Sequence, residues 1–357
     1  MIVSKRPAGD SEALRFLFAN SSCFFNRKEW FQVLEEGFKE PVVAYCLEKD
    51  GKICLALPGV IFNFGLVKMF YSNIPYGGFV GDLQLIPSSA ALFEESLRKD
   101  GIHLIRIGGT SYDEFCELEG YRKDSAFIHV VDLEGKDEET LWNSYKKRVR
   151  RDVRKAEKSG ISIHEAASPE EMDVLYGLYL ETMSRNEAFN IWTKKLFQAI
   201  YRDLARQGEA KILLAKHKDE IIAGMILLLS PETVYYFFAA SARKYLSLCP
   251  NDLLVHHGIC LAIRKGRRYY DLMTSQKEDV ALMNFKEKWG AQRSPFYIYE
   301  KSLTSIRPWI WKRMWGLMTT PMGARLIRWV RGKRMIEGSK KGKASEKHPF
   351  RMEAHGS

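Results

Sequence analysis

Three apolar segments that follow one another closely constrain the fold of this chain more than any other feature. They span residues 211–216, 221–229 and 233–239, and the gaps between them hold only polar residues and one proline. Apolar runs joined by such short turns pair as antiparallel strands. The spacing of apolar residues after residue 239 predicts a helix at 251–265, a strand at 269–273, a helix at 280–289 and a strand at 295–299. The sequence therefore predicts a mixed sheet whose antiparallel half gives way to strands joined by crossover helices.

The segment before these three strands is predicted to be mostly helical. One charged helix covers residues 138–159 and ends at Gly160, since a glycine commonly follows the last turn of a helix. A strand at 161–165 comes next. Ser168 then caps a helix that opens with Pro169, and two helices continue to about residue 206.

The first 132 residues repeat this order in a shorter form. A helix at 28–38 precedes a hairpin, because the pair Asp50-Gly51 between two apolar runs is a strong turn signal. The hairpin strands span 42–47 and 53–57. The remaining predicted elements are a strand at 67–71, a helix at 88–99 and strands at 103–107 and 127–131.

The length of the chain predicts more than one core. Its 357 residues exceed the roughly 250–300 residues at which a single core stops growing. We therefore predict an α/β (α+β) protein of two tandem modules, each a mixed sheet flanked by helices. The modules span residues 1–132 and 133–300, and the second is the expected catalytic module. A basic amphipathic helical segment at 301–336 and a disordered end at 337–357 follow.

The excess positive charge is confined to the C-terminal segment. Residues 301–357 hold 14 Lys or Arg and 3 Asp or Glu, which accounts for the whole net charge of +11. The first 300 residues are neutral, and this distribution argues against DNA as a partner. Tryptophans among such cations are typical of a segment lying on an anionic membrane surface, unless they pack on the second module instead. These tryptophans are Trp309, Trp311, Trp315 and Trp329.

Cysteine and histidine spacing predicts no metal site. The six cysteines form no CxxC pair, and no apolar export signal develops near the first residue, so we expect a reduced, cytoplasmic protein. His256 and His257 are adjacent on a helix and point about 100° apart, which prevents them from holding one metal together. Cys249 has no identifiable histidine partner and is interpreted as a small buried residue.

Several short motifs occur in a specific order between about residues 23 and 300. They are Lys28-Glu29-Trp30, Gly51-Lys52-Ile53, the segment from Tyr71 to Gly78, Arg154-Lys155-Ala156-Glu157-Lys158-Ser159-Gly160, Pro250-Asn251-Asp252, Tyr270-Asp271-Leu272 and Phe285-Lys286-Glu287-Lys288-Trp289-Gly290. In this order the chain resembles the Fem-type (FemABX-like) transferases of the GNAT acyltransferase superfamily. The resemblance implies duplicated GNAT modules that attach aminoacyl or acyl groups to amines during cell-wall and envelope synthesis.

The resemblance also implies where transfer takes place. It puts Phe285 and Lys286 by the transfer site, with Lys286 stabilising the charge that develops on the carbonyl oxygen. One such contact lowers the barrier by roughly 3 kcal/mol. The alternative is that Phe285 belongs to the core and Lys286 to a solvated helix face. Asp271, at a strand end, is predicted to orient the substrate amine or take its proton, or else to cap the next turn.

Further residues are predicted to bind substrate. Arg148, Arg151 and Lys155 lie on one face of the basic helix and fit a phosphate-bearing donor or acceptor, unless that face is only solvated. The loop at 241–251 lacks the glycines with which GNAT enzymes normally hold the pyrophosphate of coenzyme A. The predicted substrate-binding set also includes Arg243, Lys244, Asn251, Tyr76 and Trp289.

The expected function is N-acyl or aminoacyl transfer to an amine of a peptidoglycan or polysaccharide precursor, with aminoacyl-tRNA or an acyl thioester as the donor. One alternative is an N-acyltransferase that uses acyl-CoA or acyl-carrier protein in exopolysaccharide or lipid modification. Another is a non-catalytic module that binds tRNA or lipid. We expect no permanently bound cofactor. The expected partners are the envelope precursor, tRNA and the inner membrane surface, which residues 301–336 would contact.

Overall fold

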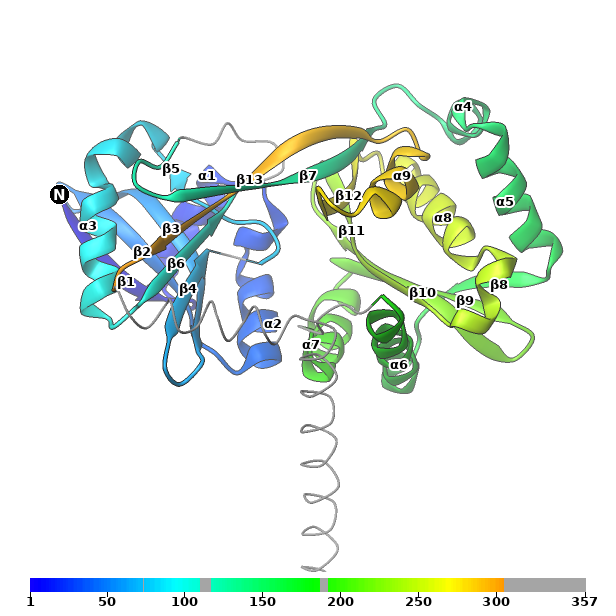
Figure 1. Ribbon diagram of the computed structural model, residues 1–357, viewed down its shortest axis with the longest axis horizontal. Helices are drawn as coiled ribbons and strands as arrows, with labels where there is room; N and C mark the ends of the chain where they lie inside the picture. The colour runs from blue at the N-terminus through cyan, green and yellow to red at the C-terminus, as the bar shows by residue number, and fades with distance from the viewer. Residues whose placement is uncertain (73, 110–116, 187–191, 305–357) are drawn as a thin grey trace, which may run out of the picture.

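The computed structural model describes residues 1–72, 74–109, 117–186 and 192–304. A 13-stranded sheet runs through them in the order β1-β2-β3-β4-β6-β13-β7-β12-β11-β10-β9-β8, with β5 paired to β3. Figure 1 shows two lobes joined by the long strands β7 and β13. The strands are β1 (Ile2–Pro7), β2 (Val42–Lys49), β3 (Lys52–Asn63), β4 (Lys68–Ser72), β5 (Val80–Gly81), β6 (Leu104–Gly108), β7 (Arg122–Asp132), β8 (Ile161–Glu165), β9 (Ala210–His217), β10 (Glu220–Leu229), β11 (Thr233–Ser241), β12 (Tyr269–Gln276) and β13 (Gln292–Ser302).

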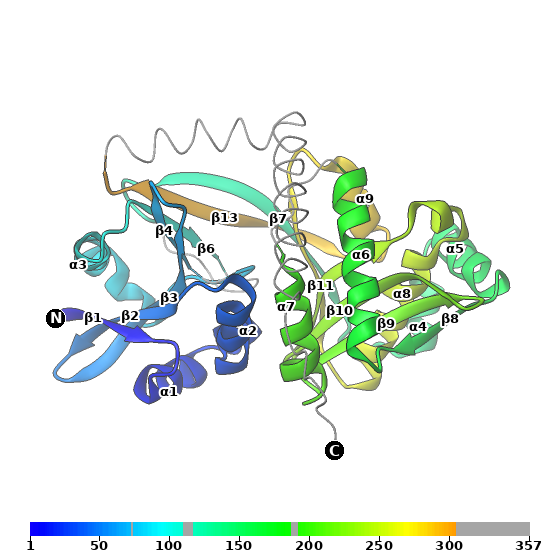
Figure 2. The same cartoon turned by 90° about the horizontal axis from the view of Figure 1, so that it is seen from below.

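Helices flank the sheet in both lobes. Helices α1, α2, α6 and α7 contribute to one hydrophobic cluster, α3 to a second, and α4, α5 and α8 to a third. Figure 2 shows α2 of the first lobe beside α7 of the second. The helices are α1 (Ser11–Asn20), α2 (Lys28–Phe38), α3 (Ile86–Lys99), α4 (Glu138–Ser144), α5 (Lys147–Lys158), α6 (Pro169–Arg185), α7 (Lys194–Ala199), α8 (Pro250–Arg264) and α9 (Val280–Glu287).

The predicted helix at 28–38 and the predicted hairpin of the first lobe are confirmed. Helix α2 has the predicted bounds, and β2 and β3 pair antiparallel around the Asp50-Gly51 turn. These two residues have φ of 52° and 74°, the left-handed geometry of a tight hairpin turn. Strand β1 and helix α1 precede all predicted elements and were not predicted. Asp10 caps α1 by accepting hydrogen bonds from two N–H groups of its first turn.

The predicted antiparallel strands of the second lobe are also confirmed. Strand β10 pairs with β9 on one side and β11 on the other. Gly160 follows α5 with φ of 75°, and Ser168 Oγ accepts a hydrogen bond from the N–H of Glu171 at the start of α6. Local turn and cap chemistry is therefore sufficient to place these elements.

The single helix predicted for residues 138–159 is wrong, because the chain breaks into α4 and α5. Tyr145 between them has an extended conformation with ψ of 139°. Its buried ring packs against Trp289, with 5.4 Å between ring centroids. The break allows α5 to pack on α8 and bury Val149 and Val153. The apolar spacing continues through the break, so the sequence does not reveal it.

The two predicted modules share one sheet. Strand β13 follows the last helix of the second lobe and pairs antiparallel with β6 of the first. On its other side it pairs with β7, which in turn pairs with β12. The boundary at residue 132 stays a prediction, since the ladder of hydrogen bonds is continuous from one lobe to the other.

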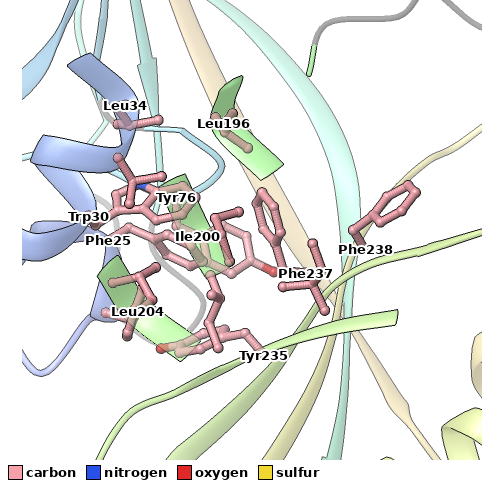
Figure 3. Packing of buried hydrophobic residues seen from close by; sticks show 14 of the residues in the cluster. Phe25, Trp30, Leu34, Tyr76, Leu196, Ile200, Leu204, Tyr235, Phe237 and Phe238 are labelled. Atoms are coloured by element: carbon pink, nitrogen blue, oxygen red, sulfur yellow. The ribbon is translucent and has the colours of Figure 1, made fainter. Parts of the chain in front are cut away.

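One hydrophobic cluster extends across both lobes. Figure 3 shows Phe25 and Trp30 of the first lobe close to Tyr235 and Phe237 of β11. The ring centroids of Phe25 and Tyr235 are 5.1 Å apart, and those of Trp30 and Phe237 are 5.3 Å apart. Such edge-to-face pairs contribute about 0.5–1.5 kcal/mol each beyond burial. The cluster therefore stabilises one arrangement of the two lobes.

The predictions for residues 301–336 and 337–357 fall almost entirely on residues 305–357, which lie outside the described residues. Both stay predictions. Strand β13 extends to Ser302, at the start of the predicted basic segment. Within the described ranges, no helix has the length and apolar character needed to span a bilayer.

Candidate functional site

Strands β11 and β12 separate in the middle of the second lobe. Their parallel pairing ends at Tyr235 and Asp271. Beyond this point β12 has one residue more than β7, so that Leu272 and Met273 together face His129. This β-bulge holds Met273 at φ of 63°, which is uncommon for a residue other than glycine. Ligands of α/β proteins bind beyond the carboxyl ends of parallel strands, so this part of β12 is the candidate site.

Asp271 and Tyr76 meet at this separation, although they are 195 positions apart. The Tyr76 hydroxyl donates to Asp271 Oδ1 at 3.1 Å, and the N–H of Met273 donates to the same oxygen at 2.7 Å. Both side chains are fully buried. Asp271 therefore caps the bulge within β12 and does not lie at a strand end as predicted. Its contact with a substrate amine stays a prediction.

Lys286 reaches from α9 to the same bulge. Its Nζ donates to the carbonyl oxygens of Met273 at 3.0 Å and Thr274 at 2.7 Å. The residue is 3% exposed, so the alternative of a solvated helix position is wrong. Burial lowers the pKa of the Lys286 amino group to about 7, although the nearby carboxylates of Asp271 and Asp279 oppose this shift.

His129 belongs to the site and is absent from the predicted set. It lies on β7 opposite the bulge, and its partner on β13 is Arg293. It is fully buried, and within the described part of the chain neither ring nitrogen has a hydrogen-bond partner. Burial, together with the charges of Lys286 and Arg293, lowers the pKa of its imidazole to about 4. A single histidine within a strand carries no sequence signal that separates it from core residues.

Phe285 on α9 and Trp289 shortly after it pack in the hydrophobic cluster that includes α8. Phe285 is half-buried, and the Lys288 Nζ lies 4.4 Å from the centroid of its ring. Lys288 also forms an ion pair with Asp252 in the first turn of α8. Trp289 is buried in the core against Tyr145. The roles predicted for Phe285 and Trp289 at the substrate stay predictions.

The basic face predicted on α5 is exposed. Arg148 and Arg151 form ion pairs with Asp152 at 3.7 Å and 2.9 Å. A groove of about 1030 Å³ is lined by α5 side chains. Several cations of α5 form no ion pair with any other described residue, namely Lys147, Arg150, Arg154, Lys155 and Lys158. This part of the helix therefore presents largely uncompensated positive charge.

The remaining predicted residues lie near the end of β11, apart from the bulge. Arg243 and Lys244 line a second cavity of about 1030 Å³ beside α6, and Lys244 pairs with Glu220 at 2.8 Å. Asn251 Nδ2 donates to Ser241 Oγ at 3.0 Å. The glycine-free loop forms a 3-10 helix, η4 (Arg243–Leu248). The fold thus brings Tyr76, Asp271 and Lys286 together. It leaves Arg243, Lys244 and Asn251 near the end of β11, and the basic face of α5 also lies away from the bulge.

On α8, Cys260 Sγ lies 3.7 Å from His256 Nδ1, but burial works against an ionised thiol at this pair. Burial lowers the pKa of His256 to about 4 and raises that of the Cys260 thiol to about 12. Cys249 is half-buried, and burial raises the pKa of its thiol. In the part of the chain that the structure describes, no three His, Cys, Asp or Glu side chains are placed to hold a metal ion.

Changing Tyr76 to phenylalanine is expected to lower the free energy of unfolding by about 1–3 kcal/mol, because the buried Asp271 carboxylate loses a donor. Tyr270→Phe is the matched control. The Tyr270 hydroxyl is also buried but has no partner among the described residues, so its removal is expected to leave stability nearly unchanged. Urea unfolding of both variants measures the difference. Equal losses would show that the Tyr76–Asp271 bond contributes nothing specific.

Residues 143–287, which belong to the second lobe, match the GNAT acetyltransferase domain family. The crystal structure of FemX superimposes with a TM-score of 0.61 at 15% identity, over 82% of this chain and 96% of that one. No curated protein sequence matches the chain.

Two further solved structures have a similar fold. The C-terminal domain of a putative lysylphosphatidylglycerol synthetase from Agrobacterium fabrum gives a TM-score of 0.56 at 13% identity, covering 86% of this chain and 95% of that one. A tandem GNAT protein from the clavulanic acid biosynthesis pathway gives 0.55 at 12% identity, covering 85% and 99%. At these identities the likeness is one of fold.

Proposed function

We propose that this chain, in which residues 143–287 match the GNAT acetyltransferase domain family and which shares its fold with FemX and a tandem GNAT protein, transfers an activated acyl or aminoacyl group to an amine of a cell-envelope precursor. The GNAT domain at residues 143–287 and the FemX-like fold support acyl transfer. Lysylphosphatidylglycerol synthetase is named for an aminoacyl product in the envelope, and its domain shares this fold.

The observation that carries the proposal is the buried group of Lys286, Asp271 and Tyr76 where β11 and β12 separate. Attack of an amine on an ester or thioester carbon produces a tetrahedral intermediate with a negatively charged oxygen. Lys286 in its protonated form would donate a hydrogen bond to this oxygen in a site with little water. Removing one such donor typically lowers kcat by about 10²–10³-fold.

The donor is proposed to be aminoacyl-tRNA. The loop at 241–251 has no glycine, and its backbone forms the short helix η4 rather than an open loop. The α5 surface offers cations that are not neutralised within the described residues. Arginine and lysine in such a row match successive phosphates of a nucleic acid. Acyl-CoA or acyl-carrier protein as donor, for an acceptor in exopolysaccharide or lipid modification, is the alternative.

A single assay distinguishes these donors. The purified protein is offered labelled aminoacyl-tRNA or labelled acyl-CoA together with amine-bearing envelope precursors, and labelled product is separated by chromatography. Loss of transfer after RNase treatment supports the RNA donor. Release of free thiol with transfer supports the thioester donor. Transfer from neither donor, with binding intact, would contradict the enzymatic proposal in favour of a tRNA- or lipid-binding module.

Replacing Arg148, Arg151 and Lys155 with glutamine together is expected to weaken tRNA binding. Each lost phosphate contact should also reduce the slope of log affinity against log salt by about 0.7–0.9. Filter binding from 50 to 200 mM salt, an interval in which such contacts weaken by orders of magnitude, is a suitable measurement. The control triple variant changes Lys49, Lys52 and Lys68, which are exposed on the first lobe. If both triple variants give the same slope, the α5 surface does not bind the phosphates of tRNA.

We further propose that residues 301–336 bring the protein to the anionic inner surface of the membrane, as a peripheral cytoplasmic protein. The support is compositional, since four tryptophans lie among the cations there. Co-sedimentation with vesicles of phosphatidylglycerol is expected for the full chain and not for a chain ending at residue 304. If neither the full chain nor the truncated chain sediments with the vesicles, the proposed membrane contact is wrong.

A further inference from the structure

The hydrogen bonds of Lys286 match a neutral amine better than an ammonium group. A lysine ammonium has three N–H donors and no acceptor, whereas the neutral amine has two N–H donors and a lone pair. In the described part of the chain, Lys286 Nζ has two acceptors, the carbonyl oxygens of Met273 and Thr274. A buried ammonium would keep one donor without a partner, which is costly. The neutral amine satisfies both donors and leaves its lone pair unused.

The surroundings of Lys286 also lack a direct counter-ion. No carboxylate among the described residues lies within ion-pair distance of its Nζ, although Asp271 on β12 and Asp279 at the start of α9 are near enough to favour the charged form. His129 on β7 is neutral, and Arg293 on β13 adds positive charge to the same region. The side chain is 3% exposed. Removing an unpaired ammonium from water is expensive, so burial favours deprotonation.

On this geometry we propose that Lys286 enters the reaction as a neutral amine and acts as the general base that deprotonates the attacking nitrogen. The inference deepens the proposed function and rests on it. It gives the site a proton acceptor. Asp271 Oδ1 is less suited to this role, because it already accepts hydrogen bonds from the Tyr76 hydroxyl and the Met273 N–H.

The proton and electron balance closes within the site. The lone pair of the acceptor amine forms the new C–N bond, and the carbonyl π electrons move to oxygen. Lys286 takes one proton from the attached nitrogen and becomes an ammonium. Its new third N–H then donates to the negatively charged oxygen. When the C–O or C–S bond to the leaving group breaks, Lys286 returns the proton to that oxygen or sulfur, and the neutral amine is restored.

The pH dependence has a defined sign. Below the pKa of Lys286, about 7, the amine is protonated and cannot accept a proton. The acceptor amine must be deprotonated as well, and an unperturbed α-amino group has a pKa of about 8. A plot of log kcat/KM against pH should therefore rise with a slope of two below about pH 7. It should continue with a slope of one up to the pKa of the acceptor.

Two measurements on the full-length protein test the inference. NMR of protein labelled with 13C and 15N at lysine gives the titration of Lys286 directly, with the signal assigned from Lys286→Gln. The pH profile of kcat/KM is then measured for the wild type, Lys286→Gln and Lys286→Arg. Arginine stays protonated and cannot act as a base, so both variants are expected to lose at least 100-fold and to keep a slope of one. Thermal unfolding confirms that each variant is folded.

The outcomes separate this inference from the proposed function. A Lys286 signal that titrates near pH 7, together with the steeper wild-type profile, supports the base. If transfer occurs but Lys286 stays protonated at pH 9, or if the profile flattens above pH 7, the base assignment is overturned and the proposed function stands. If no donor supports transfer, the proposed function fails and this inference fails with it.

Discussion

Lys286→Gln is expected to reduce acyl transfer by about 10²–10³-fold, the loss seen when one donor to the developing oxyanion is removed. Glutamine has a similar length and retains an N–H donor for a bulge carbonyl, so the fold is expected to survive. It has neither a charge nor a lone pair that takes a proton. The loss should therefore appear in kcat, with little change in KM. Steady-state kinetics with the labelled donor measures both.

The control for this variant is Lys265→Gln. Lys265 is exposed directly after α8 and forms no ion pair with another described residue. It is the same change of side chain at a surface position and leaves the bulge untouched. Full activity is expected. Should Lys286→Gln retain wild-type kcat while folded, Lys286 has no part in the chemistry.

Trp30→Ala is expected to lower the free energy of unfolding by about 3–5 kcal/mol, the usual cost of truncating a large buried aromatic residue. Trp30 is fully buried among rings from both lobes, including Phe25 and Phe237. Its indole N–H donates to the carbonyl oxygen of Ile74 at 2.8 Å, and this bond is lost as well. Urea denaturation followed by circular dichroism measures the change.

Phe18→Ala provides the comparison for Trp30→Ala. Phe18 on α1 is 77% exposed, so its truncation removes aromatic surface without opening a cavity and should cost less than about 0.5 kcal/mol. Because Trp30 packs against β11 of the second lobe, its loss is also expected to loosen the contact between lobes. If the two variants lose similar stability, the cluster shown in Figure 3 does not hold the lobes together.

Local signals predicted several elements correctly. The Asp-Gly turn between β2 and β3, the glycine after α5 and the Ser168 cap of α6 each depend on a few neighbouring residues. The helix break at Tyr145 was not predictable in this way. The break accompanies the packing of the Tyr145 ring against Trp289, which is 144 positions further along the chain.

The sequence by itself determined the order of most helices and strands after residue 27, and it determined the position of the Phe285-Lys286 segment on the last helix before β13. Only the tertiary structure decided the chemistry of that segment. Strand β13 lies between β6 and β7, and β12 bulges opposite His129. Tyr76 comes from the other lobe to Asp271. The burial that lowers the pKa of Lys286, and the carbonyls that bind its amino group, arise from contacts between distant segments. Turns and caps are local and can be read from neighbouring residues, whereas desolvation depends on how the whole chain packs.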